Sequence, residues 1–506
     1  MSSASNVARS TGYNFLTIAC NAASSLVLTA VIARWLGPAG MGTYSLVTWF
    51  FAMAAILVNL GLVTTTMKYM AEALGRGDQE EAGGVLAYGL GRLLINGLVV
   101  MVAWLLAGPW AAAAYREPHM LTLMPVAALA ILPTSAMALL TAACQGLQRY
   151  GRVALATATY TGVMVVGSLA CLALGTGIEG LLAVSAVAAI AACLLYAQTL
   201  AAWQPGWFRL GVSPERRRIL AGYSRSLMFL IILDAVVWQR SAVFFLGLWR
   251  PHQEVAYFAM AFGLATMAMK LIPGTLVGLL IPSMSRSFGS GKLDEVARIY
   301  HLAGRWMAIM ALPVAAGGAA LAVPLVTTLY GASYAPMAPV LAILLAASAL
   351  VNAFGFPASS VLYAVEGQRF MVWIGLMAAI VNIALMALLV PGYGLVGASI
   401  ATAVSQLLVL PPGAYFAGKL LGGVGPDVRR FPSVALAAVL MGAGVWAATH
   451  GLSAQLALLV GLPLGALLYA PLVVLCGGLA PEDRTRVLEV AAKLPFLRRV
   501  TARTAS

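Results

Sequence analysis

The chain has 506 residues, of which 62% are hydrophobic and only 9% are charged, and its mean hydropathy is +0.93. No water-soluble domain has this balance, so the composition excludes soluble enzymes and soluble binding modules. The formal net charge of +14 also does not indicate a nucleic-acid partner, because the basic residues follow the pattern of a membrane-topology signal described below.

Apolar segments recur along almost the whole chain, each long enough to cross a bilayer as a helix. They predict an all-α, polytopic membrane protein with about fourteen transmembrane helices. The first six lie at 14–34, 43–66, 85–107, 121–143, 153–174 and 179–202. The next six lie at 226–248, 255–281, 304–329, 337–364, 370–390 and 395–417, and two more lie at 432–449 and 454–476.

The first predicted helix ends in a distinctive motif around Gly37-Pro38. Glycine followed by proline stops a helix and turns the chain. Arg34 precedes this pair and suits the membrane interface, where amphipathic side chains anchor, and Tyr44 follows it. We therefore predict that Arg34, Gly37, Pro38 and Tyr44 form a structural motif at the interface.

The basic residues are distributed unevenly over the connections between the predicted spans. Of 30 lysines and arginines, 24 fall on the side of the N-terminus and three on the opposite side, Arg34, Arg116 and Arg250. The other three lie within predicted spans. This is a strong positive-inside signal. It predicts that both termini lie in the cytoplasm, where the basic surface also attracts anionic lipid.

Weak sequence matches suggest an internal repeat. Four short matches have offsets of 213, 214, 220 and 217 residues; among them, Pro38–Tyr44 corresponds to Pro251–Tyr257 and Gly177–Gly180 to Gly394–Gly397. Nearly constant offsets predict two six-helix lobes of the same topology. The predicted organisation is an N-terminal lobe (1–203), a cytoplasmic basic linker (204–225), a C-terminal lobe (226–418), two extra helices (419–476) and a cytoplasmic amphipathic tail (477–506).

The seventh and eighth predicted spans carry charges that a lipid-facing helix would not tolerate. Asp234 and Arg240 lie in the seventh and Lys270 in the eighth, and each charge at mid-membrane costs about 2.5–3.5 kcal/mol. Such helices line a wet or protein-walled interior. Arg240 and Lys270, with Arg92 in the third span, are the predicted cavity cations that bind substrate phosphate.

Other roles for these residues stay open at this point. Asp234 and Lys270 could form a structural salt bridge across the two helices, whereas Arg240 points about 120° away from Asp234 on the same helix. Asp234 could instead bind a coupling proton or sodium ion. Arg92 lies near the start of its span, and could snorkel to the inner surface.

Signs of catalysis are missing from the sequence. It contains neither the G-x-x-x-x-G-K-[ST] phosphate loop nor H-E-x-x-H, and its five cysteines show no metal or disulfide spacing. We predict that the protein is not an enzyme and holds no metal or other cofactor. An integral-membrane glycan polymerase or ligase is the enzyme alternative, and would be expected to have a large external loop with clustered polar groups.

Four motifs, in this order and spacing, carry a family resemblance: A-R-W-L-G-P-x-G-x-G-x-Y-S from residue 33, A-E-A-L-G-R-G-D from 71, G-L-Q-R-Y from 146 and E-G-Q-R-F from 366. The chain resembles the polysaccharide transporters, or Wzx-type flippases, of the multidrug/oligosaccharidyl-lipid/polysaccharide (MOP) exporter superfamily. The resemblance implies two lobes around a central cavity and a polyprenyl-diphosphate-linked oligosaccharide substrate. It also implies a location in the bacterial cytoplasmic (inner) membrane. The implied partners are membrane lipids, polysaccharide polymerases and glycosyltransferases.

Two related groups are alternatives. Lipid II flippases are similar to this chain at the end of the first helix, but their cavity arginines would fall on Ala22, Leu28 and Ile56 and their cavity aspartate on Thr43. None of the four residue types matches, which disfavours lipid II as substrate. Drug exporters of the superfamily usually have twelve spans, so the two additional predicted spans favour the polysaccharide branch.

Overall fold

The computed structural model describes residues 2–234, 241–271, 274–365 and 367–479, although not the side chains of residues 2–23 and of some positions beside the gaps. Every regular element in this described part is helical. The chain divides into two compact units. Unit 1 comprises Met1–Met260 with Gly375–Thr402, and unit 2 comprises Ala261–Ile374 with Ala403–Ser506.

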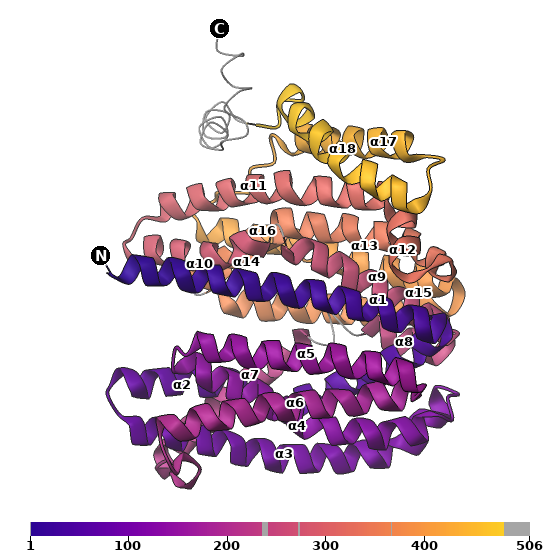
Figure 1. Ribbon diagram of the computed structural model, residues 1–506. Helices are drawn as coiled ribbons and strands as arrows, with labels where there is room; N and C mark the ends of the chain where they lie inside the picture. The colour runs from indigo at the N-terminus through magenta and orange to yellow at the C-terminus, as the bar shows by residue number, and fades with distance from the viewer. Residues whose placement is uncertain (1, 235–240, 272–273, 366, 480–506) are drawn as a thin grey trace. The chain divides into compact units, whose positions relative to one another are not determined.

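Unit 1 is built around α4, which packs against α1, α2, α3 and α6 (Figure 1). Its core includes the fully buried side chains of Met70, Leu86 and Tyr196. The helices are α1 (Ser2–Asn59), α2 (Leu62–Gly75), α3 (Gln79–Ala114), α4 (Met120–Gly146), α5 (Tyr150–Leu174), α6 (Gly177–Trp203), the 3₁₀ turn Trp207–Arg209, α7 (Pro214–Asp234), α8 (Ser241–Trp249), the first half of α9 (His252–Leu271) and the middle of α15 (Gln368–Leu408).

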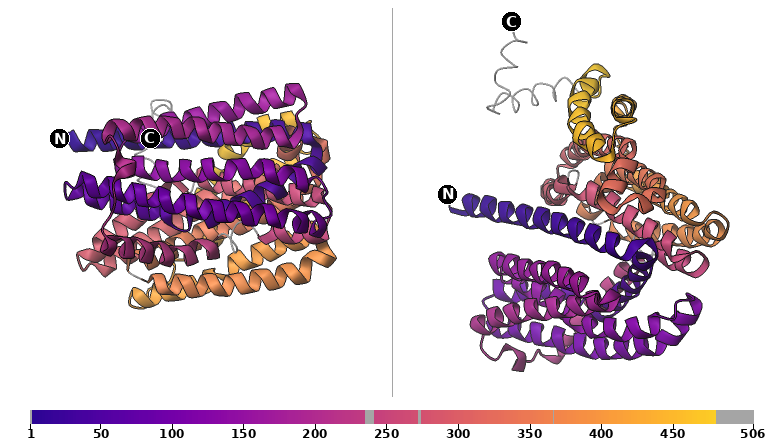
Figure 2. Two further views of the ribbon diagram at one scale, coloured as in Figure 1. Left: turned by 90° about the horizontal axis from the view of Figure 1, so that it is seen from below. Right: turned by 45° about the vertical axis from the view of Figure 1, so that its right-hand side comes forward.

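Unit 2 is organised around α11, which packs against α13 and α17, while α17 and α18 lie side by side (Figure 2). Tyr469 of α18 donates a hydrogen bond to the Ile309 carbonyl of α11 at 2.8 Å. The helices are α10 (Gly274–Gly289), α11 (Leu293–Ala320), α12 (Ala322–Tyr330), the 3₁₀ turn Ala332–Met337, α13 (Ala338–Leu350), the π-helical Val351–Gly355, α14 (Phe356–Ala364), α16 (Leu410–Leu420), α17 (Phe431–Thr449) and α18 (Ala454–Leu475).

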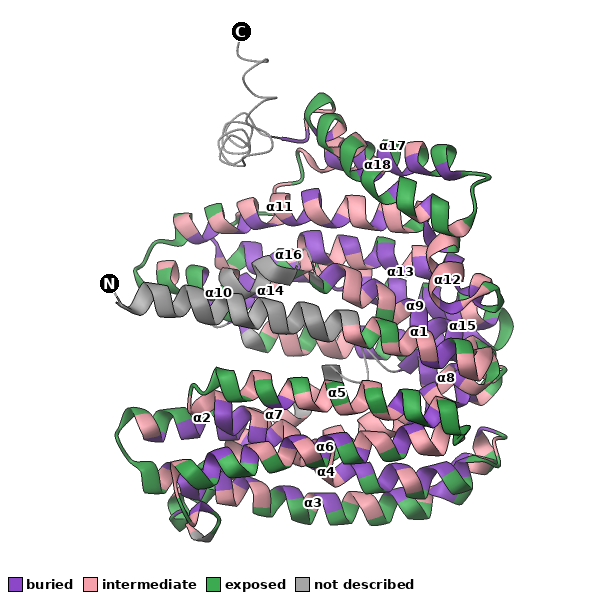
Figure 3. Cartoon of the chain, viewed as in Figure 1, coloured by how far each residue is buried: buried purple, intermediate pink, exposed green. Residues whose placement is uncertain are grey.

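Large apolar side chains stay exposed on several helices, as on α3 and α18 (Figure 3). Leu106 is 76% exposed and Leu475 81% exposed. A soluble protein rarely presents such apolar faces, whereas the lipid-facing surface of a membrane protein requires them. Within the described residues, ten helical segments are long and apolar enough to cross a membrane.

Two of those ten segments, Ser24–Gly75 and Arg369–Leu420, are each 52 residues long. A continuous helix of that length would measure roughly 78 Å, more than twice the bilayer core. Each is interrupted, at Gly37 (φ 67°) and at Gly394 (φ 50°), in the left-handed region that glycine tolerates. The predicted turn at Gly37-Pro38 is thus confirmed, and neither segment is one continuous helix.

Some of the remaining predicted spans match single helices of the structure, whereas others cover two helices. Predicted spans 153–174 and 454–476 agree closely with α5 and α18. Predicted span 255–281 covers two helices, α9 and α10, and 304–329 covers α11 and α12. The total of fourteen spans and the two-lobe division stay predictions, and the tail from residue 480 lies outside the described residues.

Candidate functional site

Helix α7 begins in the linker and lies against α2 at one end of unit 1. Ser213 accepts a hydrogen bond from the backbone N–H of Arg216 at 3.2 Å, which satisfies a free donor of the first turn. Further along α7, Ser224 donates to the Leu60 carbonyl at 2.6 Å. That carbonyl lies at the break between α1 and α2, where Gly61 has φ 80°. We call this region, where α7 meets the ends of α2 and α3, the linker end.

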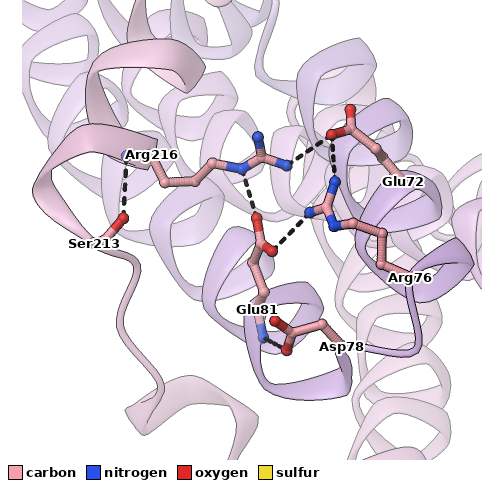
Figure 4. Close-up of polar contacts among 6 residues, drawn as sticks. All are labelled: Glu72, Arg76, Asp78, Glu81, Ser213 and Arg216. Carbon is pink, nitrogen blue, oxygen red and sulfur yellow. Dashed lines mark hydrogen bonds and ion pairs between the residues drawn. The ribbon is translucent and has the colours of Figure 1, made fainter.

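Four charged side chains form a closed network at the linker end (Figure 4). Arg76 contacts Glu72 at 2.6 Å and Glu81 at 2.7 Å. Arg216 contacts the same two carboxylates, at 3.1 Å and 2.6 Å. Two guanidinium groups and two carboxylates balance in charge, and Asp78 caps α3 beside them by accepting from the Glu81 N–H at 2.8 Å. The network joins the linker to α2 and α3 without leaving a net charge.

Lys68 lies two turns before the end of α2, beside this network. Its ammonium nitrogen is 4.2 Å from the centre of the Tyr223 ring and 5.0 Å from the centre of the Tyr69 ring. The Arg216 guanidinium also lies over Tyr69, at 4.9 Å. The two tyrosines pack edge to face at 5.5 Å. Residues of α2 and α7, more than 150 positions apart, therefore position one lysine.

This arrangement can bind an anion. Glu72 and Glu81 are occupied by arginines, and Lys68 has no ion pair with any carboxylate of the described residues. Lys68 is exposed, and its ammonium group offers three donors. Aromatic faces hold a cation in place without neutralising its charge. Phosphate oxygens accept strong hydrogen bonds from such a group.

The sequence-predicted cavity cations lie in different parts of the chain, and only two of them have described side chains. Arg92 is exposed on α3, on the same side as the exposed Ile95 and Val99. Lys270 is exposed in the last turn of α9. Asp234 is the last residue of α7, with its side chain outside the description, and Arg240 lies outside the described residues altogether. The roles given to these four residues stay predictions.

The interface motif occupies the opposite end of unit 1. Helix α3 has 36 residues, so its two ends are about 54 Å apart. Arg34 is exposed and Tyr44 is partly buried near the bend at Gly37. Beside them, Thr43 donates to Glu117 at 2.9 Å, and His252 lies 3.1 Å from the same carboxylate. We call Thr43, Glu117 and His252 the bend cluster.

Comparison with protein families identifies the chain. Residues 31–339, more than half of its length, match the model of a family described as "Polysaccharide biosynthesis protein". The chain belongs to the polysaccharide biosynthesis protein family. A comparison with curated protein sequences gave no match.

Solved structures show which fold this family member has. A lipid II flippase MurJ in an inward closed conformation superposes with a TM-score of 0.74 at 11% identity, over 92% of this chain and 98% of that one. An inward-facing multidrug resistance MATE family transporter of the MOP superfamily gives 0.70 at 17%, over 79% and 94%. A MOP superfamily transporter from Pyrococcus furiosus gives 0.57 at 16%, over 81% and 95%. The family member is a multi-pass membrane protein with the MOP transporter fold.

Sequence reasoning did not find the linker-end site or the bend cluster in this family member. Lys68 could be read only as a basic residue at the end of a span, and His252 only as a scattered loop histidine. One local signal was available, the Glu72–Arg76 spacing of four residues on a helix. The partners Tyr223 and Glu117 are too distant in sequence for any periodicity to join them to Lys68 or His252.

Proposed function

We propose that the protein is a flippase that moves a polyprenyl-diphosphate-linked oligosaccharide, the repeat unit of a polysaccharide or lipopolysaccharide, across the bacterial cytoplasmic membrane. The family match over residues 31–339, together with the transporter fold over nearly the whole chain, carries this proposal. The protein acts by alternating access and catalyses no covalent step. Both termini lie in the cytoplasm, following the distribution of basic residues.

In this proposal Lys68 captures the substrate. A diphosphate carries negative charge that the bilayer core cannot solvate, so cations must replace its hydration. Lys68 lies just beyond the predicted end of the second span, where a lipid-linked diphosphate would approach from the membrane surface. Its ammonium group is held by Tyr69 and Tyr223 rather than by a carboxylate, so no ion pair has to break when phosphate binds.

The next steps rest on the residues that the sequence singled out. Arg240, Lys270 and Arg92 stabilise the diphosphate along the path, while the polyprenyl tail stays in the bilayer and the sugars travel in the polar interior. Asp234 binds the coupling ion, a proton or sodium, or releases Lys270 when the substrate arrives. The substrate reaches the protein from glycosyltransferases and leaves toward a polymerase.

Lipid II is the alternative substrate, because one of the similar solved structures is a lipid II flippase. At 11% identity the likeness concerns the fold alone. The apolar residues Ala22, Leu28 and Ile56 stand where cavity arginines of lipid II flippases would align. We therefore favour an oligosaccharide diphosphate over lipid II.

Reconstitution tests the proposed function directly. The purified chain in liposomes should move a fluorescent polyprenyl-diphosphate oligosaccharide to the opposite leaflet, measured by its accessibility to a membrane-impermeant quencher. In cells, deletion should accumulate the lipid-linked repeat unit on the inner leaflet. Accumulation on the outer leaflet would instead indicate a polymerase or ligase. Transport of lipid II but not of the oligosaccharide diphosphate would show that lipid II is the substrate.

The variant Lys68→Gln should slow flipping with little effect on folding, since the side chain is exposed. A hydrogen bond to a charged group contributes about 1.5–3 kcal/mol, so we expect an initial rate roughly ten- to a hundredfold lower at limiting substrate. Lys68→Arg keeps the charge and should retain most of the rate. Lys292→Gln removes an exposed lysine before α11 and is the matched control. Equal rates for the Lys68→Gln and Lys292→Gln variants would remove Lys68 from the substrate path.

A further inference from the structure

The imidazole of His252 lies in the bend cluster with an acceptor at each of its nitrogens. Nδ1 is 3.1 Å from Glu117 Oε2 and 3.3 Å from Thr43 Oγ1. On the other side of the ring, Nε2 is 3.2 Å from the carbonyl oxygen of Tyr115. The side chains of His252 and Glu117 are 16% and 15% exposed, and Thr43 is 7% exposed. The three groups are therefore largely withdrawn from water.

Counting donors shows which form of the imidazole fits. At Nδ1 the ionised Glu117 presents a carboxylate oxygen, which only accepts, whereas the Thr43 hydroxyl can donate or accept. Tyr115 presents a carbonyl oxygen, which also only accepts. A neutral imidazole carries a single N–H, whereas the doubly protonated ring donates from both nitrogens. Only the protonated ring can donate to both the Glu117 carboxylate and the Tyr115 carbonyl, and it pairs in charge with Glu117.

The remaining charged groups around the cluster do not replace that pair. On the α3–α4 connection, Arg116 and His119 are both exposed. On the α8–α9 joint, Arg250 and Glu254 bind each other at 3.0 Å. Helix α1 contains no charged residue between Arg34 and its end at Asn59. Glu117 is thus the carboxylate that faces His252.

The cluster joins three separate parts of unit 1. Thr43 belongs to the second half of α1, Glu117 to the α3–α4 connection, and His252 to the start of α9. Backbone packing reinforces the contact, because a Cβ on Gly42 would collide with the His252 carbonyl oxygen. In the predicted two-lobe division, the first two parts belong to the N-terminal lobe and the third to the C-terminal lobe. Alternating access requires such contacts to break at one end of the transporter.

We propose that His252 binds a proton and acts as a latch: protonated, it holds the start of α9 to Glu117 and Thr43, and deprotonated, it releases them. The role of this latch in transport rests on the proposed function, whereas the contacts of His252 do not depend on it. When the ring loses a proton, one nitrogen lone pair faces an acceptor oxygen, and the charge-assisted hydrogen bonds are lost. Acidity therefore keeps this end of unit 1 joined, and alkalinity favours its separation.

The distance between two spin labels, measured on the full chain in lipid nanodiscs, tests the latch. The five native cysteines are replaced by alanine, and spin labels are placed at the exposed positions Ala113 and Gln253. Between pH 5.5 and pH 8.5 we expect the ratio of separated to joined populations to rise about tenfold. His252→Gln should show the separated population at both pH values. His119→Gln, which removes the exposed histidine nearby, should respond like the parent.

A distance distribution that does not change with pH in the parent overturns the latch, as does a His252→Gln variant that still responds. The flipping assay separates this outcome from the proposed function. If the distances respond to pH but the chain flips no lipid, the latch is supported and the proposed function is contradicted. If the chain flips lipid but the distances do not respond to pH, the proposed function is supported and the latch is contradicted.

Discussion

Gly42→Ala is expected to lower the thermal stability of the protein by roughly 2–5 °C, corresponding to about 2–3 kcal/mol of overpacking. A Cβ at this position would overlap the His252 carbonyl oxygen and lie 2.9 Å from the His252 Cβ. The nearest obstacle is backbone, which cannot rotate away as a side chain could. The start of α9 would have to move off α1, which would also weaken the bend cluster. Fluorescence-detected size exclusion after heating measures the loss.

Gly91→Ala is the matched control for that prediction. Gly91 lies on α3, is exposed, and a Cβ there would have no heavy atom within 4 Å. Alanine is the better helix former, so this variant should be neutral or more stable by about 0.5–1 kcal/mol. Equal losses in the Gly42→Ala and Gly91→Ala variants would show that close approach at Gly42 is unimportant.

Glu254→Ala is expected to cost about 2–4 kcal/mol. The Glu254 carboxylate accepts from the Leu395 N–H at 2.6 Å, directly after the bend in α15 at Gly394. It also pairs with Arg250 at 3.0 Å, and its side chain is only 18% exposed. Without it, a backbone donor and a half-buried guanidinium lose their shared acceptor. Glu254→Gln keeps one acceptor oxygen and should recover part of the loss.

The control for Glu254 is the Glu295–Arg298 pair on α11. It is also an acidic–basic pair near the start of a helix, but its side chains are 39% and 67% exposed. Exposed pairs contribute at most about 1 kcal/mol, so Glu295→Ala should leave the unfolding temperature nearly unchanged. If the two variants lose the same stability, burial of Glu254 and its bond to Leu395 contribute nothing measurable.

Features that depend on local properties of the chain could be predicted from the sequence. The length of an apolar segment decides whether it can cross a bilayer, so α5, α6, α17 and α18 were predicted to within a few residues. The bend at Gly37 was predictable because Gly-Pro breaks a helix wherever it occurs. The family resemblance also followed from short motifs, and residues 31–339 match a polysaccharide biosynthesis family.

The polar sites were decided by tertiary packing alone. Lys68 meets Tyr223 because Ser224 ties α7 to the break after α1, and His252 meets Thr43 across 209 positions of sequence. Hydropathy treats each helix separately, whereas the partner of a polar side chain depends on how two helices are rotated and placed against each other. The sequence by itself therefore determined that this chain is a membrane protein and where several of its helices begin and end. Only the folded chain determined which charges are neutralised, as at Arg76 and Arg216, and which remain available, as at Lys68.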